Sequence, residues 1–277
     1  MVGVELVRNY LIRIMESLKK SILFLSLALL FVGCKGGLEN KQISSLEVVE
    51  DGVWTSLFNG KDLQGWKIKN VKEESDNNFW SVDNGVIVVN SLGNTKHDYS
   101  WLISDKEYAN FKLKLEFQSF RESPGNSGVQ IRSRYDDNGK LENSNVTGWL
   151  DGPQVDIHPS DPWRTGFIYD ETRGHQRWIY PSLPDWNIDK QVYAPEKFIH
   201  FYSDEAPYWN EMVIVCVNNR IVTSVNGITV ADYNGIGVLD DAFHQKYGIA
   251  KKGFIALQLH KNDELKIAFR NIKIKEL

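Results

Sequence analysis

FKLKLEFQ, residues 111–118, alternates apolar and polar side chains along its whole length. Leu113, Leu115 and Phe117 occupy odd-numbered positions, and the lysine, glutamate and glutamine residues of the run occupy even-numbered positions. Successive side chains of a β-strand point to opposite faces of its sheet, so this period of two predicts a strand with one buried face. We therefore expect residues 111–118 to belong to a sheet that covers an apolar core.

The same alternation recurs along the chain after residue 53. The other runs are GVIVVN (85–90), SGVQIRSR (127–134), PQVDIH (153–158), EMVIVCV (211–217), RIVTSVNGITVADY (220–233), FIALQLH (254–260) and LKIAFRNIKIKEL (265–277). The pairs Asn218-Asn219 and Asn226-Gly227 lie between such runs and predict tight hairpin turns. No amphipathic helix longer than two turns is predicted, so the pattern indicates an all-β sandwich. Between residues 133 and 210 we expect long loops, which are often functional.

Four of the predicted strands carry a polar stripe opposite their apolar one. The stripes consist of Lys112, Lys114, Glu116 and Gln118; Gln130 and Arg132; Gln154, Asp156 and His158; and Gln258 and His260. Every sandwich has a solvated outer face, but such faces are normally rich in lysine, glutamate, serine and threonine. Glutamine, aspartate, histidine and arginine make directional hydrogen bonds. If the strands are neighbours, these groups converge on one face and form a binding site.

The N-terminal residues have the composition of a secretory signal. Lys19 and Lys20 precede an uncharged run over residues 21–33, which is too short to span a membrane as a helix. The segment that begins at Met15 would by itself make a signal of normal length. We expect residues 1–33 to be a signal peptide whose true start is Met15.

Cys34 ends this apolar run and is followed by polar residues. Together with Leu30-Phe31-Val32-Gly33, it resembles the lipobox of bacterial lipoproteins, in which the cysteine is lipidated. The resemblance implies a lipid on Cys34, a tether over residues 34–52 and a place in the bacterial cell envelope, at the outer membrane or in the periplasm. An ordinary cleaved signal with an incidental cysteine is the alternative.

The composition narrows the classes of partner. The formal charge is −4 and no block rich in lysine or arginine occurs, which argues against nucleic acid. The nine tryptophans can pack in a core or stack on the apolar face of a sugar ring. If Cys34 is lipidated, Cys216 has no disulfide partner, and its apolar run indicates a buried, unreactive thiol.

Three motifs resemble a known family, the bacterial 3-keto-disaccharide hydrolase domain family. They are SLFNGKDLQGWKI (56–68), NSGVQIR (126–132) and GFIALQLHKNDELKIAFRNIKIKEL (253–277). The resemblance covers residues 53–277 and implies one concanavalin A-like jelly-roll β-sandwich domain. Many members have a Glu-x-Gln-Ile run where this chain has GPQVDIH, with Gln154 and Asp156 in those places. This difference leaves open which carboxylate acts.

The resemblance implies a carbohydrate substrate and the cleavage of 3-keto-glycosides. A ketone at C3 acidifies the hydrogen at C2, so a base can remove that proton and the enolate can expel the C1 substituent, after which water adds. Such a route needs a base, an acid and a cation or donor for the enolate oxygen. The candidates for catalysis are Asp156, Glu171, His260, Arg132 and Glu116, of which Arg132 would face the enolate oxygen. The candidates for substrate binding are Gln130, Gln154, Tyr169, Arg173, Gln258 and Trp163, with Trp149, Trp178 and Trp186 as further rings for stacking.

Structural roles are the alternative for several of these residues. Asp156 and Arg132 could form an ion pair, Tyr169 and Glu171 could hold a loop, and Asp170 is expected to cap a turn. No compact ligand spacing predicts a metal, and no phosphate loop or dinucleotide fingerprint predicts a cofactor, so a separate sugar 3-dehydrogenase would have to make the ketone. A non-catalytic carbohydrate-binding module and a conventional two-carboxylate glycosidase remain as alternative functions.

Overall fold

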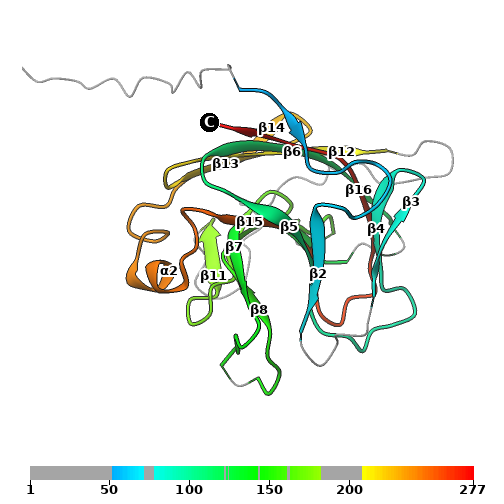
Figure 1. The fold of residues 1–277 in the computed structure, drawn as a ribbon, viewed down its shortest axis with the longest axis horizontal. Coiled ribbons are helices and arrows are strands. Elements are labelled where there is room, and N and C mark those ends of the chain that lie inside the picture. The colour runs from blue at the N-terminus through cyan, green and yellow to red at the C-terminus, as the bar shows by residue number, and fades with distance from the viewer. Residues whose placement is uncertain are drawn as a thin grey trace, which may run out of the picture. The chain divides into compact units, whose positions relative to one another are not determined.

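Two antiparallel sheets pack face to face in the computed structural model (Figure 1). The described residues are 52–71, 78–121, 123, 125–142, 144–160, 163–181 and 208–277. They lie within one unit, Val48–Leu277. This arrangement confirms the all-β, concanavalin A-like jelly-roll sandwich that the sequence predicts.

Each sheet has eight strands among the described residues. Sheet A consists, in spatial order, of β14 (Ile228–Asn234), β13 (Arg220–Val225), β12 (Asn210–Val217), β6 (Phe111–Ser119), β16 (Lys266–Glu276), β4 (Val86–Asn90) and β3 (Trp80–Asp83), with β1 (Thr55–Ser56) paired to β16. Sheet B consists of β11 (Arg177–Tyr180), β10 (Ile168–Asp170), β9 (Pro153–Ile157), β7 (Ser127–Asp136), β15 (Gly253–Leu259), β5 (Ser100–Tyr108) and β2 (Trp66–Asn70), with β8 (Trp149–Asp151) paired to β7.

Both predicted hairpins are present in sheet A. The turn at Asn218 and Asn219 joins β12 to β13, and the turn at Asn226 and Gly227 joins β13 to β14. Asn218, Asn226 and Gly227 have φ angles of 51°, 50° and 78°, which is the left-handed region that tight turns require. The Asn and Gly residues in the sequence therefore fix the order of three neighbouring strands.

The core lies between the sheets and follows the alternation of β6. Leu113, Leu115 and Phe117 are fully buried, whereas the lysines between them remain partly exposed. Val129 and Leu257 of sheet B belong to the same buried cluster. A further cluster, which includes Trp101 and Trp149, is separate from this core.

Two tryptophans and the internal cysteine also lie in the core. Trp66 and Trp80 are buried there. Cys216 is fully buried, and burial raises the pKa of its thiol to about 12. The thiol is therefore a packing group, as its apolar run indicates.

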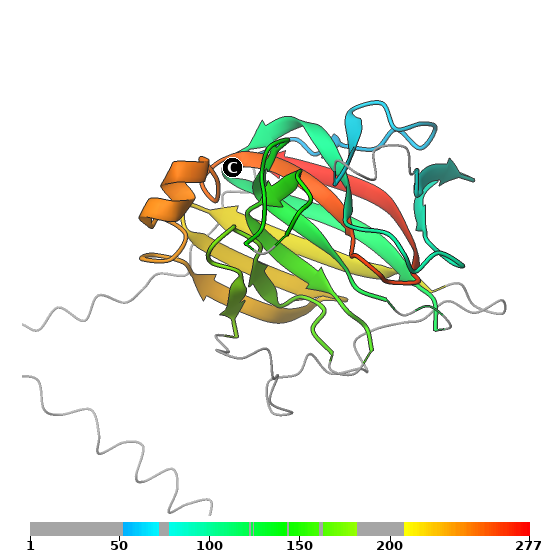
Figure 2. The same cartoon turned by 90° about the horizontal axis from the view of Figure 1, so that it is seen from below.

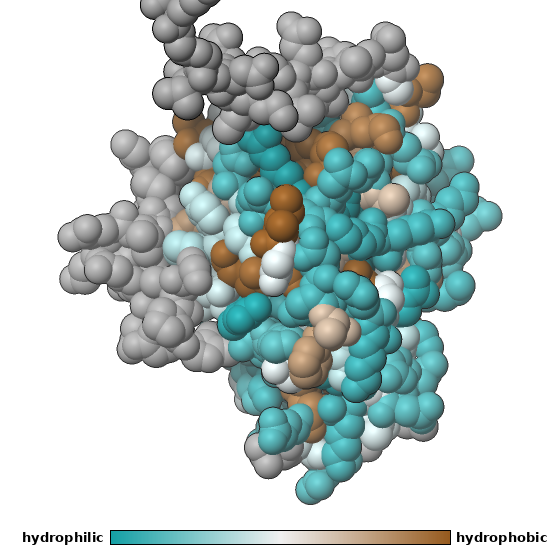
Figure 3. Space-filling view, turned by 90° about the vertical axis from the view of Figure 1, so that its left-hand side faces the viewer, coloured by the Kyte–Doolittle hydropathy of each residue, from teal (hydrophilic) through white to brown (hydrophobic). Residues whose placement is uncertain are grey.

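One short helix, α2 (Ala242–Tyr247), lies at an end of the sandwich (Figures 1 and 2). The side chain of Asp241 accepts a hydrogen bond from the backbone N–H of His244 and caps the helix. Gly248 ends it with a φ of 63°. This side of the molecule is mainly hydrophilic, with small separate apolar areas (Figure 3).

The region of predicted long loops holds four short strands as well. β8, β9, β10 and β11 fall between residues 133 and 210 and complete one side of sheet B. Three of them have only three or four residues, which is too few to show a period in the sequence. Residues 182–207 and residues 1–51, which include Cys34, lie outside the described residues. No helix among the described residues is long and apolar enough to span a membrane.

Replacing Phe117 by alanine tests the packing between the sheets. The side chain is fully buried, so we expect the cavity to lower the free energy of unfolding by about 3–5 kcal/mol. Lys112→Ala alters the other face of the same strand and should change it by less than about 0.5 kcal/mol. Urea denaturation measures both, and equal losses would contradict the assignment of the two faces.

Candidate functional site

Sheet B brings three of the predicted polar stripes together on the face turned away from the core. In the register of β9, β7 and β15, Gly128 lies between Asp156 on one side and Gln258 on the other. The neighbouring row places Gln154 opposite Gln130. Because these strands are neighbours, residues that are more than 100 positions apart in the sequence share one surface.

Gly128 makes room for the polar side chains beside it. A Cβ atom at this position would lie 2.4 Å from Cδ of Gln154, so the Gln154 side chain crosses β7 where no side chain stands. Gln130, one row away, is covered: its Nε2 donates to the carbonyl oxygen of Leu150 in β8 at 3.0 Å. Gln154 is therefore available to a ligand, whereas Gln130 supports the sheet.

A small hollow of about 70 Å³ opens over this face. It is lined by Tyr99, Asn126, Gln154, Asp156, Arg164, Tyr169, Glu171, Gln176, Trp178 and His260. Six of these residues were named as candidates from the sequence, and Tyr99, Asn126, Arg164 and Gln176 were not. The hollow combines carboxylates, amides, an imidazole, a guanidinium and aromatic rings in one place.

Glu171 is a buried acid of the hollow that is held through both its side chain and its backbone. Its carboxylate accepts from Nε2 of Gln176 at 3.2 Å and from Nε2 of Gln258 at 3.5 Å. The backbone of Glu171 is held as well, because its N–H donates to Gly152 and its carbonyl accepts from Nε1 of Trp149. The carboxyl thus has a defined position at the end of β10.

Burial raises the pKa of Glu171 from 4.5 to about 7. The two amide hydrogen bonds oppose this shift, and the negative charges of Asp156 and Asp170 add to it. A carboxyl with a pKa near neutrality can accept or donate a proton at physiological pH. Glu171 is therefore the best general acid or base of the hollow.

Asp156 forms a buried ion pair. Its Oδ2 lies 3.1 Å from Nε of Arg164, and its Oδ1 accepts from Nε2 of Gln154 at 3.3 Å. The guanidinium of Arg164 also lies 5.5 Å from the ring centre of Trp178. The carboxylate of Asp156 therefore holds a cation and an amide in place at the hollow.

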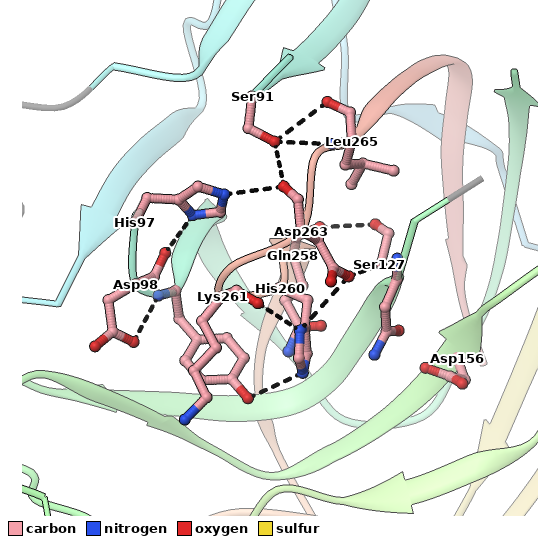
Figure 4. A network of polar contacts seen from close by, with 12 residues as sticks. Ser91, His97, Asp98, Ser127, Asp156, Gln258, His260, Lys261, Asp263 and Leu265 are labelled. Carbon is pink, nitrogen blue, oxygen red and sulfur yellow. Dashed lines mark hydrogen bonds and ion pairs between the residues drawn. The ribbon is translucent and has the colours of Figure 1, made fainter. Parts of the chain in front are cut away.

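His260 and Tyr99 form a contact pair on another side of the hollow. Nε2 of His260 lies 3.1 Å from the Tyr99 hydroxyl, and Nδ1 lies 3.0 Å from the carbonyl oxygen of Lys261 and 3.6 Å from Oδ2 of Asp263 (Figure 4). Burial lowers the pKa of His260, whereas the nearby Asp263 carboxylate opposes that shift. The neutral form of the imidazole is therefore favoured.

The segment after β15 holds this histidine in place. The carbonyl oxygen of Asp263 accepts from the Ser91 hydroxyl at 2.6 Å, and its carboxylate accepts from the Asn126 N–H at 2.8 Å. A ring nitrogen of His97 lies 3.0 Å from the same Asp263 carbonyl (Figure 4). Two separate parts of the chain, residues 91–97 and Asn126, thus fix the turn that follows His260.

Several buried polar atoms of the site have no hydrogen-bond partner within the described part of the chain. They include Oε1 of Gln154, Oε1 of Gln258 and Nε1 of Trp178. Buried polar groups are normally paired, so such atoms call for a partner from outside the described residues. A ligand with several hydroxyl groups can donate to the two oxygens and accept from the indole.

The expectation that Arg132 shares this face is wrong. Arg132 has a φ of 50° and lies where the pairing of β7 with β15 shifts register. This bulge turns its side chain away, and its guanidinium donates to the carbonyl oxygens of Ala109 at 2.6 Å and Ala250 at 3.0 Å. Arg132 therefore joins backbone segments, and Arg164 supplies the guanidinium at the hollow.

The expectation that Glu116 joins the site is wrong too. Glu116 belongs to β6 of sheet A, on the face where its neighbours are partly exposed. Its carboxylate accepts from Nε of Arg270 at 2.6 Å and from Nδ2 of Asn271 at 3.0 Å. Alternation assigns a face within one strand but cannot show which of two sheets contains it.

Other expected binding residues lie outside the lining of the hollow. Nε of Arg173 donates to the buried carboxylate of Asp151 at 2.9 Å, so the arginine forms a structural ion pair. Trp163 is partly buried and does not line the hollow. Trp149 lies behind Glu171, to which it donates, and Trp186 lies outside the described residues.

Asp170 has the role that its parity predicts. Its carboxylate accepts from the backbone N–H of Thr172 at 3.1 Å and from the Thr172 hydroxyl at 2.5 Å, so it caps the turn after β10.

No three His, Cys, Asp or Glu side chains of the described residues are grouped in a way that could hold a metal ion.

Glu171→Gln tests the buried carboxyl through stability. The raised pKa means that ionisation costs stability: the cost is absent below about pH 4.5, grows up to about pH 7 and is complete above it, at about 3 kcal/mol. The glutamine variant should therefore gain stability relative to the wild type as the pH rises. Urea denaturation at pH 5 and pH 8 measures the gain, and a difference that does not change with pH would contradict the raised pKa.

Comparison with solved structures reports distant likenesses. A Parabacteroides distasonis protein, provisionally described as a glycosyl hydrolase, is 24% identical with a TM-score of 0.48, over 82% of this chain and 94% of that chain. A second from the same species is 22% identical with a TM-score of 0.49, over 81% and 100%. The carbohydrate-binding module CBM66 from Bacillus subtilis is 14% identical with a TM-score of 0.45, over 76% and 96%.

Comparison of the sequence with known families is more specific. A search of curated proteins found no match. The family model described as a 3-keto-alpha-glucoside-1,2-lyase-like domain matches residues 53–275, which is almost the whole sandwich. The chain therefore belongs to the 3-keto-alpha-glucoside-1,2-lyase-like domain family.

Proposed function

We propose that this protein cleaves 3-keto-glycosides at the C1 bond, by elimination followed by addition of water. The observation that carries the proposal is Glu171, a buried carboxyl whose pKa burial raises to about 7, in a hollow lined by amides and aromatic rings. Membership of the family supports the choice of reaction. A 3-keto sugar is suited to such a group because a single base near neutrality can remove its acidified C2 hydrogen.

The proton steps are assigned to two groups that line the hollow. The Glu171 carboxylate takes the C2 proton, and the electron pair of the C2–H bond becomes an enolate on the C3 oxygen. The ketone re-forms as the C1–O bond breaks, and the leaving oxygen takes a proton from His260 through the Tyr99 hydroxyl, whose contact with Nε2 is 3.1 Å. Water then adds across the new C1–C2 double bond.

The remaining polar groups bind and stabilise the sugar. Arg164, which replaces Arg132 in this role, is the cation for the enolate oxygen, because a guanidinium stays charged and directs several donors. Gln154 and Gln258 each have a buried oxygen that can accept from a sugar hydroxyl. Trp178 lines the same hollow and offers a ring for stacking and an N–H donor.

The proposal also implies a supplier of the ketone. This reaction consumes a sugar that has already been oxidised at C3, so a separate sugar 3-dehydrogenase must act before it.

We further propose that a lipid on Cys34 anchors the enzyme in the bacterial cell envelope, which is consistent with a substrate taken up from outside the cell. Mass spectrometry of Cys34 would test the lipid.

Aglycone release tests the reaction class. The protein from residue 35 onward is incubated with an aryl glucoside and with the same glucoside oxidised at C3. We expect release from the ketone alone. Release from the unoxidised glucoside would instead indicate a two-carboxylate glycosidase, and sugar binding without release from either would indicate a carbohydrate-binding module.

The pH profile tests the two proton-transfer groups. Burial raises the pKa of Glu171 to about 7 and lowers that of His260, so the reactive form, with Glu171 ionised and His260 protonated, is most populated at a pH between the two pKa values. We expect kcat/KM on the 3-keto substrate to form a bell whose maximum lies below pH 7, falling roughly tenfold per pH unit on each side. A profile that is flat from pH 5 to pH 9 would overturn the assignment.

Glu171→Gln should lower kcat by at least about 100-fold, because the base is removed while the shape is kept. Glu116→Gln is the matched control: it makes the same chemical change on sheet A, where Glu116 pairs with Arg270. Circular dichroism should show both variants folded. Equal activity of the two variants would remove Glu171 from the mechanism.

A further inference from the structure

His244 of α2 is buried between two carboxylates. Its Nδ1 lies 2.8 Å from Oδ1 of Asp241, and its Nε2 lies 3.1 Å from Oδ2 of Asp170; the side chains of His244 and Asp170 are both 0% exposed. A neutral imidazole has one N–H and can donate to only one of these acceptors. Burial alone would lower the pKa of His244, but the two carboxylates outweigh that effect and raise it, which favours the doubly protonated, positively charged ring.

Asp170 connects this ring to the proposed base. It is the last residue of β10 and directly precedes Glu171 in the chain. While Oδ2 faces His244, Oδ1 accepts from the N–H and the hydroxyl of Thr172. One buried carboxylate thus holds α2 on one side and the turn that follows Glu171 on the other.

Further contacts join α2 to the same turn. The guanidinium of Arg173 lies 4.6 Å from the ring centre of Tyr247, and the ring of His175 lies 4.1 Å from that of Phe243. α2 therefore packs along the segment that carries Glu171, from behind the hollow, and none of its residues lines the hollow.

We propose that the buried His244–Asp170 ion pair sets the proton affinity of Glu171 from behind the site. His244 is a positioning residue here, because it acts through Asp170 and does not line the hollow. The inference depends on the proposed catalytic role of Glu171 only where it concerns turnover. The effect of the ion pair on the protonation of Glu171 can be tested without any substrate.

The charges around Glu171 and His244 determine whether a substitution should raise or lower the pKa of Glu171. The carboxylates that act on Glu171 are Asp156, which pairs with Arg164, and Asp170, which pairs with His244. The other titratable groups at the hollow are His260, Tyr99 and Tyr169. Around His244 the charged groups are Asp170 and Asp241, with His175 lying 3.8 Å from Asp241. Each carboxylate near Glu171 thus has its own cation, and removing one cation leaves a bare negative charge beside the base.

Two substitutions should shift the pKa of Glu171 in opposite directions. Asp170→Asn removes the negative charge but keeps the acceptor for Thr172, and its amide can donate to Nε2 of a neutral His244. The pKa of Glu171 should then fall. His244→Gln leaves Asp170 without its cation, so the pKa of Glu171 should rise, each time by roughly one pH unit.

The pH dependence of stability measures this pKa in the full-length protein. The difference in unfolding free energy between Glu171→Gln and its parent is followed from pH 4 to pH 10. It grows above the unfolded-state pKa and levels off at the pKa of Glu171 in the folded protein, so its midpoint moves in the same direction as that pKa, by half as much. The series is measured in the wild-type, Asp170→Asn, His244→Gln and His175→Gln backgrounds. His175→Gln is the matched control, a histidine of the same turn whose distance to Asp241 is longer.

Midpoints that move down for Asp170→Asn and up for His244→Gln, with no shift for His175→Gln, would support the proposal. Equal midpoints in all backgrounds, or shifts in the same direction, would overturn it. If His244→Gln does not fold, the downward shift for Asp170→Asn against an unshifted control decides the question. An absence of turnover on every 3-keto-glycoside would count against the proposed function, whereas the midpoints would still decide the role of the ion pair.

Discussion

The site depends on a carboxyl that is buried with amide donors and that has no cation of its own in the part of the chain that the structure describes. Gln176 and Gln258 hydrogen-bond to Glu171, but amides stabilise a buried negative charge less than a guanidinium would. Ionisation therefore remains costly, which is why the pKa lies near neutrality. The surrounding structure holds the group against this cost: Trp149 and Gly152 fix its backbone.

Much of the fold follows from local patterns, because each pattern has one physical cause. The alternation of β6 and β12 exists because one face of each strand is buried, and the Asn-containing turns exist because their backbone has positive φ. The short strands β8, β10 and β11 show no such pattern. β8 is held by pairing with β7, β10 by pairing with β9, and β11 by pairing with β10, which is information about neighbours in space rather than along the chain.

The difference between patterns along the chain and neighbours in space also explains which site residues the sequence predicts. Gln154, Asp156 and His260 lie in or beside regular strands, so parity placed them correctly on one face. Arg132 has the correct parity but lies in a bulge, which turns its side chain away. The alternation places Glu116 correctly on the polar face of its strand, but that strand belongs to sheet A rather than to sheet B. Arg164 lies in an irregular segment between β9 and β10, where no period exists, and its pairing with Asp156 appears only in three dimensions.

Energetic cost helps to choose between a binding role and a catalytic one. A carbohydrate-binding surface needs rings and hydrogen-bonding groups, and Gln154, Gln258 and Trp178 provide them, with unpaired buried atoms whose cost a bound sugar would offset. Glu171 is different, because above neutral pH it costs about 3 kcal/mol, which is a large part of the stability of a typical domain. An amide in its place could accept a hydrogen bond from a hydroxyl without that penalty. A group that gains or loses a proton near neutral pH is useful mainly where a proton must be moved, so its presence favours an enzyme over a binding module.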